Sequence, residues 1–207
     1  MSSWKTNFRP ALVATAIVTV ATGLVYPALV WVPAHVLFPG QANGSIAIHD
    51  GKAVGSYLIA QGVTDSGSFR PRPSAAASGY VGDTSSGSNA GPLNRSYVDT
   101  TVPGRVAAYR ADNGLPPDRP VPAGAATASG SGLDPDITVE DALLQVPRVA
   151  RVRKIQPQIL EAFVRSTAHD RGWDPDSLRP VNVLALNLAL EEGHVHSMSS
   201  DWTPSPK

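Results

Sequence analysis

The chain has 207 residues, with 17 basic and 17 acidic side chains and no cysteine. Balanced charge argues against a nucleic-acid-binding protein, which needs a basic excess on one face, and the lack of cysteine excludes disulfides, thiolate metal sites and thiol nucleophiles. The 18 glycines and 19 prolines predict long loops between short elements of secondary structure.

A long stretch without charged side chains lies near the N-terminus, at residues 11–38. Its most apolar part, residues 12–30, would be about 28 Å long as a helix that rises ~1.5 Å per residue. This length matches a bilayer hydrocarbon core of about 30 Å. A cleaved signal peptide is the alternative, but its apolar region usually has only about 7–15 residues. We therefore expect a retained membrane anchor.

Basic residues indicate how this anchor is oriented. Lys5 and Arg9 precede the apolar stretch, and no Lys or Arg follows until Lys52. The positive-inside rule then places the N-terminus in the cytoplasm. The expected parts are a cytoplasmic tail at residues 1–9, a transmembrane helix at 10–38 and one extracytoplasmic domain at 39–207.

The expected membrane helix carries small residues at every fourth position, namely Ala11, Thr15, Thr19 and Gly23. Such spacing lets a second helix approach closely, although alanine-rich helices also show it by chance. Pro27 removes one backbone donor and its ring crowds the carbonyl of Gly23, for which Thr22 is a candidate partner. One helix cannot enclose a pore, so a transport role requires partners. The predicted helix-packing residues are Thr15, Thr19, Gly23 and Pro27.

The first half of the remaining chain is mostly loop. Two short apolar runs at residues 45–48 and 55–60 flank Asp50-Gly51, which predicts a β-hairpin. Between residues 63 and 95 Gly, Ser, Pro and Asn dominate, which indicates a loop. A short helix is predicted within residues 101–113, and the proline-rich stretch after it must be extended or turning.

The C-terminal half has stronger helical signals. Thr138 and Asp141 have the spacing of a capping box at a helix start. Pro147 either kinks that helix or starts a second one at residues 147–154. Residues 156–169 carry a helical apolar stripe, whereas residues 181–190 fit either a strand running into a helix or a helix throughout. Mixed signals predict one loop-rich α+β domain.

Catalytic motifs are absent from the sequence. It has no phosphate-binding loop, dinucleotide fingerprint, zinc-protease motif, nucleophile elbow or Asp-Lys-Thr-Gly-Thr phosphorylation motif. Ser129 and Ser131 lie in a Gly-rich loop, but no base is evident, so a turn is the favoured interpretation. His194 and His196 could bind a metal as a pair, but no third ligand is near in sequence.

A basic cluster follows Pro147 and consists of Arg148, Arg151, Arg153 and Lys154. It could contact an anionic headgroup, a nucleotide or an acidic partner. It could equally be a solvated helix face, where positive charge is favourable near the C-terminal end of a helix. The neutral charge of the whole domain favours the solvated face.

Several short motifs occur in a fixed order along the chain. They are residues 22–27 (Thr-Gly-Leu-Val-Tyr-Pro), 41–45 (Gln-Ala-Asn-Gly-Ser), 55–56 with Gln61, 72–75, 86–92, 127–135 (Thr-Ala-Ser-Gly-Ser-Gly-Leu-Asp-Pro), 148–150, 181–184 and 187–190. Together they resemble the KdpC family, the C subunits of bacterial Kdp potassium-transporting P-type ATPases, over nearly the whole chain. The motif-loop residues that the resemblance singles out are Gln41, Asn43, Gly44, Ser45, Arg72, Ser74, Ser88, Asn89, Asn94, Ser129, Gly130, Ser131, Gly132 and Asp134.

The resemblance implies an accessory, non-catalytic subunit of an ATP-driven potassium uptake complex in the cell membrane. Its implied partners are a channel-like A subunit, a P-type B subunit that hydrolyses ATP and a small F subunit. It implies no intrinsic cofactor, with ATP involved only through the complex, and no nucleic acid. Family members are described as catalytic chaperones that raise the ATP affinity of the B subunit. The predicted topology, however, separates the domain from cytoplasmic ATP.

Three side chains depart from the family pattern: Leu93, Asp136 and Ala185. Two other functions remain as alternatives. One is a membrane-anchored extracytoplasmic serine hydrolase that uses Ser129 or Ser131, and the other is a structural surface domain on an anchor.

Overall fold

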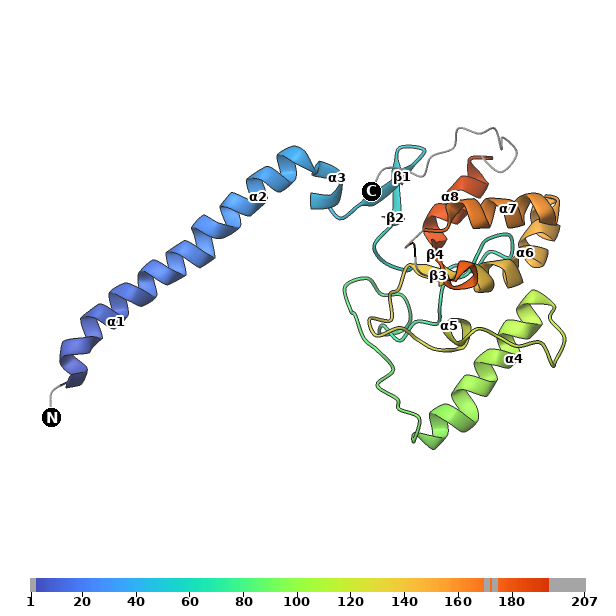
Figure 1. The fold of residues 1–207 in the computed structure, drawn as a ribbon, viewed down its shortest axis with the longest axis horizontal. Coiled ribbons are helices and arrows are strands. Elements are labelled where there is room, and N and C mark those ends of the chain that lie inside the picture. Colours follow the sequence, from blue (N-terminus) through green and yellow to red (C-terminus); the bar gives the residue numbers. More distant parts are fainter. Residues whose placement is uncertain (1–2, 170–171, 173–174, 194–207) are drawn as a thin grey trace. The chain divides into compact units, whose positions relative to one another are not determined.

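The computed structural model describes residues 3–169, 172 and 175–193, so His194 and His196 lie outside the described residues. The chain forms two compact units, Met1–Ile46 and Ala47–Lys207. Figure 1 shows a helical first unit and a second unit of short helices, small sheets and long loops. The expected fold class, a long apolar helix followed by a mixed α+β domain, is confirmed.

The first unit is a continuous helical segment followed by a short turn. It consists of α1 (Ser3–Val20), the π-helical turn η1 (Ala21–Val25), α2 (Tyr26–Leu37) and α3 (Pro39–Ala42). The part Asn7–Leu37 has 31 residues and none of its most apolar window is buried, so it is long and apolar enough to cross a membrane. A signal sequence near an N-terminus passes the same test.

The π-turn lies directly before Pro27. The N–H of Tyr26 donates to the carbonyl of Ala21, five residues back, instead of four. We attribute the wide turn to Pro27, whose ring conflicts with the carbonyl four residues earlier in a regular α-helix. The Thr22 hydroxyl donates to the carbonyl of Val18 at 2.7 Å, not to that of Gly23 as the sequence suggested.

The predicted hairpin of β1 (Ile46–His49) and β2 (Lys52–Ser56) begins at the last residue of the first unit and otherwise belongs to the second. Asp50 and Gly51 both have positive φ, 49° and 73°, as a tight hairpin turn requires. The second strand begins earlier than the predicted run at residues 55–60 and ends at Ser56, so residues 57–60 lie outside the sheet. There the N–H of Ala60 donates to the carbonyl of Leu133 at 2.8 Å.

Two strand–helix units form the centre of the domain. Strand β3 (Asp136–Thr138) pairs antiparallel with β4 (Pro180–Asn182), with Ile137 opposite Val181. Each strand runs directly into a helix, α6 (Val139–Arg153) or α8 (Val183–Glu191). Thr138 caps α6 by accepting from the N–H of Asp141 at 3.2 Å, as predicted. Asn182 caps α8 by accepting from Ala185 at 3.0 Å, so residues 181–190 are the strand-then-helix alternative.

Helix α6 is continuous through Pro147, so no second helix starts there. The Pro147 side chain is exposed. The helix ends at Lys154, whose φ is 57°, and α7 (Pro157–Thr167) packs back against it (Figure 1). The core lies among β3, β4, α6, α7 and α8, and one buried aromatic ring, Phe69, enters it from a loop. Its largest fully buried apolar residues are Phe69, Val139, Val146, Val149, Leu160, Val164, Val181 and Leu186.

The predicted short helix is α4 (Val102–Asn113), which follows a second π-helical turn, η2 (Tyr97–Thr101). A single helical turn, α5 (Ala123–Ala126), packs beside α4, and the 3₁₀ turn η3 (Asp176–Leu178) precedes β4. The loops between these elements place the functional candidates described next.

Candidate functional site

Two side-chain amides hold the loop that carries Phe69. Asn187 of α8 accepts from the N–H of Phe69 at 2.7 Å and donates to its carbonyl at 2.9 Å. Gln145 of α6 accepts from the N–H of Arg70 at 2.8 Å and donates to its carbonyl at 3.1 Å. These side chains supply the hydrogen bonds that a neighbouring strand would provide, so the loop is fixed against both helices.

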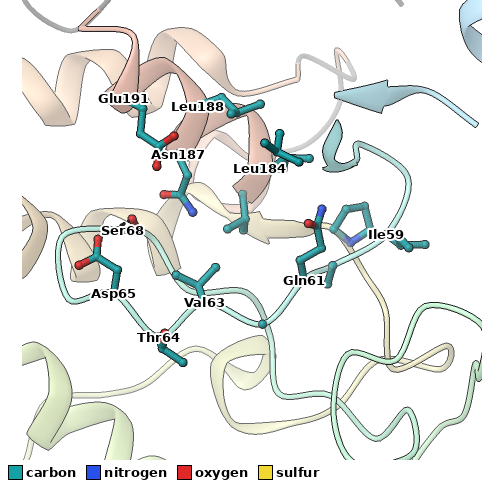
Figure 2. A pocket seen from close by; sticks show the side chains of 15 residues that line it. Ile59, Gln61, Val63, Thr64, Asp65, Ser68, Leu184, Asn187, Leu188 and Glu191 are labelled. Atoms are coloured by element: carbon teal, nitrogen blue, oxygen red, sulfur yellow. Dashed lines mark hydrogen bonds between the residues drawn. The ribbon is translucent and has the colours of Figure 1, made fainter. Parts of the chain in front are cut away.

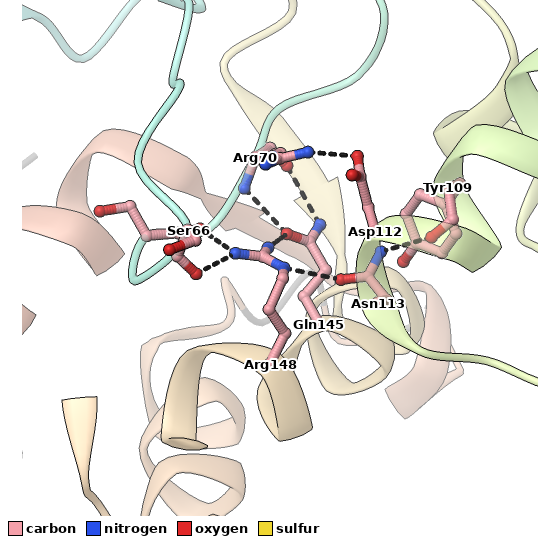
Figure 3. Close-up of polar contacts among 8 residues, drawn as sticks. Ser66, Arg70, Tyr109, Asp112, Asn113, Gln145 and Arg148 are labelled. Atoms are coloured by element: carbon pink, nitrogen blue, oxygen red, sulfur yellow. Dashed lines mark hydrogen bonds and ion pairs between the residues drawn. The ribbon is translucent and has the colours of Figure 1, made fainter. Parts of the chain in front are cut away.

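Arg148 of α6 also holds this loop (Figure 3). We refer to Gln145, Arg148 and Asn187 together as the clamp. The Arg148 guanidinium donates to the carbonyls of Ser66 and Ser68, at 2.5 and 2.9 Å, and to the side-chain oxygens of Asn113 and Gln145, both at 2.9 Å. The residue is 3% exposed, and burial lowers the pKa of its guanidinium below the ordinary value. No carboxylate lies within ion-pair distance of it among the described residues, so its hydrogen bonds go to neutral oxygens, while Asp112 and Asp65 act on its charge from farther away.

The predicted basic cluster is therefore wrong as a single surface. Arg148 is buried, whereas Arg151 and Lys154 are exposed. Arg153 turns back to the same loop, where it donates to the carbonyl of Gly67 at 2.7 Å. Successive positions on a helix face different directions, so only two of the four side chains face solvent freely.

A buried carboxyl group lies beside the clamp. Asp141 is 3% exposed and accepts from the Tyr109 hydroxyl at 2.6 Å and from Gln145 at 3.0 Å. Burial raises the pKa of Asp141 above its usual value, and burial together with Asp141 raises that of Tyr109. Nearby, Arg70 forms an ion pair with Asp112. The Tyr109–Asp141 contact joins α4 to α6, and the Arg70–Asp112 pair joins α4 to the loop that carries Phe69.

The Ser-Gly-Ser-Gly motif, residues 129–132, contacts the loops that carry Ser74 and Ser86. We refer to this meeting of loops as the loop junction. The carbonyl of Ser131 accepts from the N–H of Ser86 at 2.9 Å, and that of Gly132 accepts from the Ser74 hydroxyl at 2.6 Å. Gly132 has φ 68°, and a Cβ there would lie 2.3 Å from the carbonyl oxygen of Ser86. Only glycine fits this crossing. Two residues after the motif, Asp134 accepts from Arg72 at 2.8 Å.

The two serine hydroxyls of this motif stabilise their own turn. Ser131 accepts from the N–H of Leu133 at 3.1 Å, and Ser129 accepts from that of Asp134 at 3.3 Å. Within the described part of the chain, neither hydroxyl bonds to a histidine or a carboxylate. A serine nucleophile needs such a base, so the geometry does not support a hydrolase.

Other predicted motif residues lie apart from this junction. Ser88, Asn89 and Asn94 are exposed, and Asn94 caps the following helical segment by accepting from the N–H of Tyr97 at 3.0 Å. The remaining predicted residues belong to the first unit, where Asn43 donates to the carbonyl of Pro39 at 2.7 Å. Those residues are Gln41, Gly44 and Ser45 in the turn, and Thr15, Thr19, Gly23 and Pro27, all exposed, on the long helix.

The three departures from the family pattern occupy different settings. Leu93 is 94% exposed. Asp136 accepts from the side chain of Asn182 at 3.2 Å and so links β3 to β4. Ala185 uses its N–H to complete the Asn182 cap. Only Asp136, among these side chains, makes a hydrogen bond that an alanine would lose.

A groove of about 320 Å³ runs between α8, β2 and residues 59–68 (Figure 2). Its walls include Ile59, Leu184 and Leu188, and Asn187 faces it from α8. Gln61, another lining residue, packs on Gly55, where a Cβ would lie 1.9 Å from its amide nitrogen. This contact explains why glycine and glutamine occur together in the motif. No group of three or more potential metal ligands occurs among residues 3–169, 172 and 175–193.

Comparison with known proteins gives a consistent result. The family model described as "KdpC: K+-transporting ATPase, c chain" matches residues 8–192. The potassium-transporting ATPase KdpC subunit of Mycobacterium tuberculosis is 46% identical over 182 residues, which cover 88% of this chain and 96% of the relative. The KdpC subunit of Rhodospirillum rubrum is 45% identical over 186 residues, 90% and 95% of the two chains. That of Dechloromonas aromatica is 44% identical over 191 residues, 90% and 97%.

Proposed function

The chain belongs to the KdpC family of potassium-transporting ATPase subunits, and from this premise we propose that it joins the other Kdp subunits in the membrane and stabilises their assembly. It is a non-catalytic subunit of that ATPase. The observation that carries the proposal is the family match over residues 8–192, with relatives covered almost end to end. The clamp and loop junction fit this role, because their polar groups are used to hold backbone rather than to face a substrate.

The helix Asn7–Leu37 anchors the subunit by a single pass. Lys5 and Arg9 place its N-terminus in the cytoplasm, and the domain that follows lies outside. Thr15, Thr19, Gly23 and Pro27 are exposed and pack against a helix of a partner. One helix encloses no pore, so potassium moves through a partner.

The partners are a channel-like A subunit, a P-type B subunit and a small F subunit. The domain packs near the outer mouth of the A subunit. The extracytoplasmic domain meets no cytoplasmic ATP. An effect of this chain on the ATP affinity of the B subunit is therefore transmitted through contacts within the membrane.

Affinity purification of the complex tests this proposal. A tagged chain is co-expressed with the other Kdp subunits and recovered from detergent-solubilised membranes. We expect the P-type ATPase subunit to co-purify at a fixed ratio and to be lost when the helix is exchanged for an unrelated transmembrane helix. A hydrolase or a structural surface domain would recover no ATPase, and that result would contradict the proposal.

A further inference from the structure

We propose that the groove between α8 and residues 59–68 receives a basic side chain, lysine or arginine, from a neighbouring subunit of the complex. This inference rests on the proposed function and adds to it the surface and the chemistry of one contact. The groove combines an apolar wall with a pair of carboxylates, and these two features together select the occupant.

The apolar wall suits the stem of a long basic side chain. Leu184 and Leu188 are one turn apart on α8 and line the groove with Ile59 and Val63. Figure 2 shows Leu184 and Ile59 on one side of Asn187, with Asp65 and Glu191 on the other. The aliphatic part of lysine or arginine packs on such a surface while its charged end continues to polar groups.

The carboxylate of Asp65 is held in place and charged. It accepts from the Ser68 hydroxyl at 2.8 Å, and this bond, with one from the Gly67 backbone, keeps the pKa of Asp65 below its ordinary range. Its side chain is 61% exposed, so it remains accessible from the groove. A pre-positioned, ionised acceptor of this kind forms strong charge-assisted hydrogen bonds.

Glu191, at the end of α8, supplies the second carboxylate. It also lines the groove, and its side chain is 48% exposed. A histidine, His49, lies 3.8 Å from it, but the same imidazole also lies 3.5 Å from Glu192 and 3.6 Å from Asp50. One imidazole carries at most one positive charge and is shared among three carboxylates, so it does not by itself offset the charge of Glu191.

Within the described part of the chain, two guanidinium groups act on Asp65, those of Arg153 and of Arg148, and Arg148 is buried with its donors bonded to other oxygens. Arg153 lies 3.8 Å from Asp65, but its shorter contacts go to the carbonyl of Gly67, at 2.7 Å, and to the Ser68 hydroxyl, at 3.2 Å. Because more than half of the Asp65 side chain is exposed, its carboxylate can still accept a cation from a neighbouring chain. Two of the residues that line the groove are carboxylates and none is a lysine, arginine or histidine, so the lining complements a basic side chain and disfavours an acidic one.

Paired neutralising variants test the inference in the whole complex. Asp65→Asn with Glu191→Gln removes both groove charges. Asp118→Asn with Glu161→Gln removes two exposed charges that do not line the groove, and so serves as the matched control. Each complex is purified through a tag on the ATPase subunit and washed at rising salt, and the retained chain is quantified. Because surface charge pairs are individually weak, we expect about fivefold less of the groove variant than of the control at the same salt.

Charge reversal guards against a folding artefact. Glu191→Lys changes a half-exposed side chain at a helix end, so it should leave the unfolding temperature unchanged and release the chain at still lower salt. Equal retention of the groove and control variants would overturn the inference while leaving the proposed function intact. Failure of the wild-type chain to co-purify would instead defeat the proposed function itself.

Discussion

Arg148 shows how much of this domain depends on a few buried polar side chains. Its guanidinium satisfies four oxygens, two of them backbone carbonyls of a loop about 80 residues away in sequence. With Gln145 and Asn187 it replaces the strand that the loop lacks. Such a network stabilises the fold only while every member is satisfied.

Replacement of Arg148 by methionine should therefore destabilise the domain. Methionine keeps much of the volume but leaves the four oxygens without their donor, which should lower the free energy of unfolding by about 2–4 kcal/mol. Urea unfolding of the detergent-solubilised chain, followed by circular dichroism, measures the change. The exposed neighbour is the control, since Arg151→Met should alter the same quantity by less than about 0.5 kcal/mol. Equal effects would restore the interpretation of a solvated basic face.

Asp141 predicts how stability depends on pH. Burial raises its pKa in the folded state, so the folded protein holds this proton more tightly than the unfolded chain does. The resulting stability is complete below the ordinary carboxyl pKa and is lost as pH rises through the raised value.

We expect Asp141→Asn to remove this loss. The asparagine oxygen can still accept from Tyr109 and Gln145 but carries no charge to desolvate. The variant should unfold at a higher urea concentration than wild type at pH 8, with the two converging near pH 4. A wild type that gains stability through this pH range, relative to the variant, would show that the carboxylate is stabilised instead.

The sequence did not reveal these residue roles, and the reason is physical. Hydrophobic periodicity assigns every arginine to the solvent-facing side of a helix, so the sequence pattern groups Arg148 with Arg151 and Lys154. What buries Arg148 is a loop distant in sequence, which periodicity cannot detect. One feature of the sequence does point to the buried role of Arg148: Gln145 and Arg148 are three residues apart and therefore share one helix face.

At the scale of elements, local chemistry predicted more than long-range contacts did. The Asp50-Gly51 turn and the Thr138 cap were both identified from short-range rules and are confirmed. The choice between strand and helix at residues 181–190 stayed open, because β4 has only three residues and its partner β3 lies more than 40 residues earlier. Strands this short depend on their pairing rather than on their own pattern.

The Ser-Gly-Ser-Gly junction gives the test at this scale. Gly132→Ala forces a left-handed backbone on alanine, which costs about 1–3 kcal/mol, and places its Cβ against the carbonyl of Ser86. We expect a clear fall in unfolding temperature. Gly130→Ala, two residues earlier, is the matched control, since a Cβ there meets nothing within 4 Å. If both variants unfold like wild type, the motif is not the structural junction described above.

For the whole molecule, the sequence predicted an apolar helix followed by a small α+β domain, and this is confirmed. Helix length and the absence of charge decide that feature locally, so no tertiary information was needed. The orientation across the membrane remains a prediction from Lys5 and Arg9. The contacts with partner subunits depend on other chains, which one sequence does not contain.

Reporter fusions test the orientation. Alkaline phosphatase fused after Gly193 should be active, because it folds only outside the cytoplasm, whereas a green fluorescent protein at the same site should stay dark. Fusion of the fluorescent protein ahead of Ser3 should be bright. A bright C-terminal fusion, or a mature chain without its first forty or so residues, would contradict a retained single-pass anchor.

Potassium uptake provides the most direct measurement for the account as a whole. A strain with the Kdp system as its sole high-affinity potassium uptake route is deprived of this chain only, and rubidium uptake is measured as a potassium analogue at micromolar concentration. An accessory subunit required for assembly predicts that uptake disappears and returns when the chain is re-expressed. Uptake that continues unchanged without the chain would contradict its role in the potassium-transporting complex.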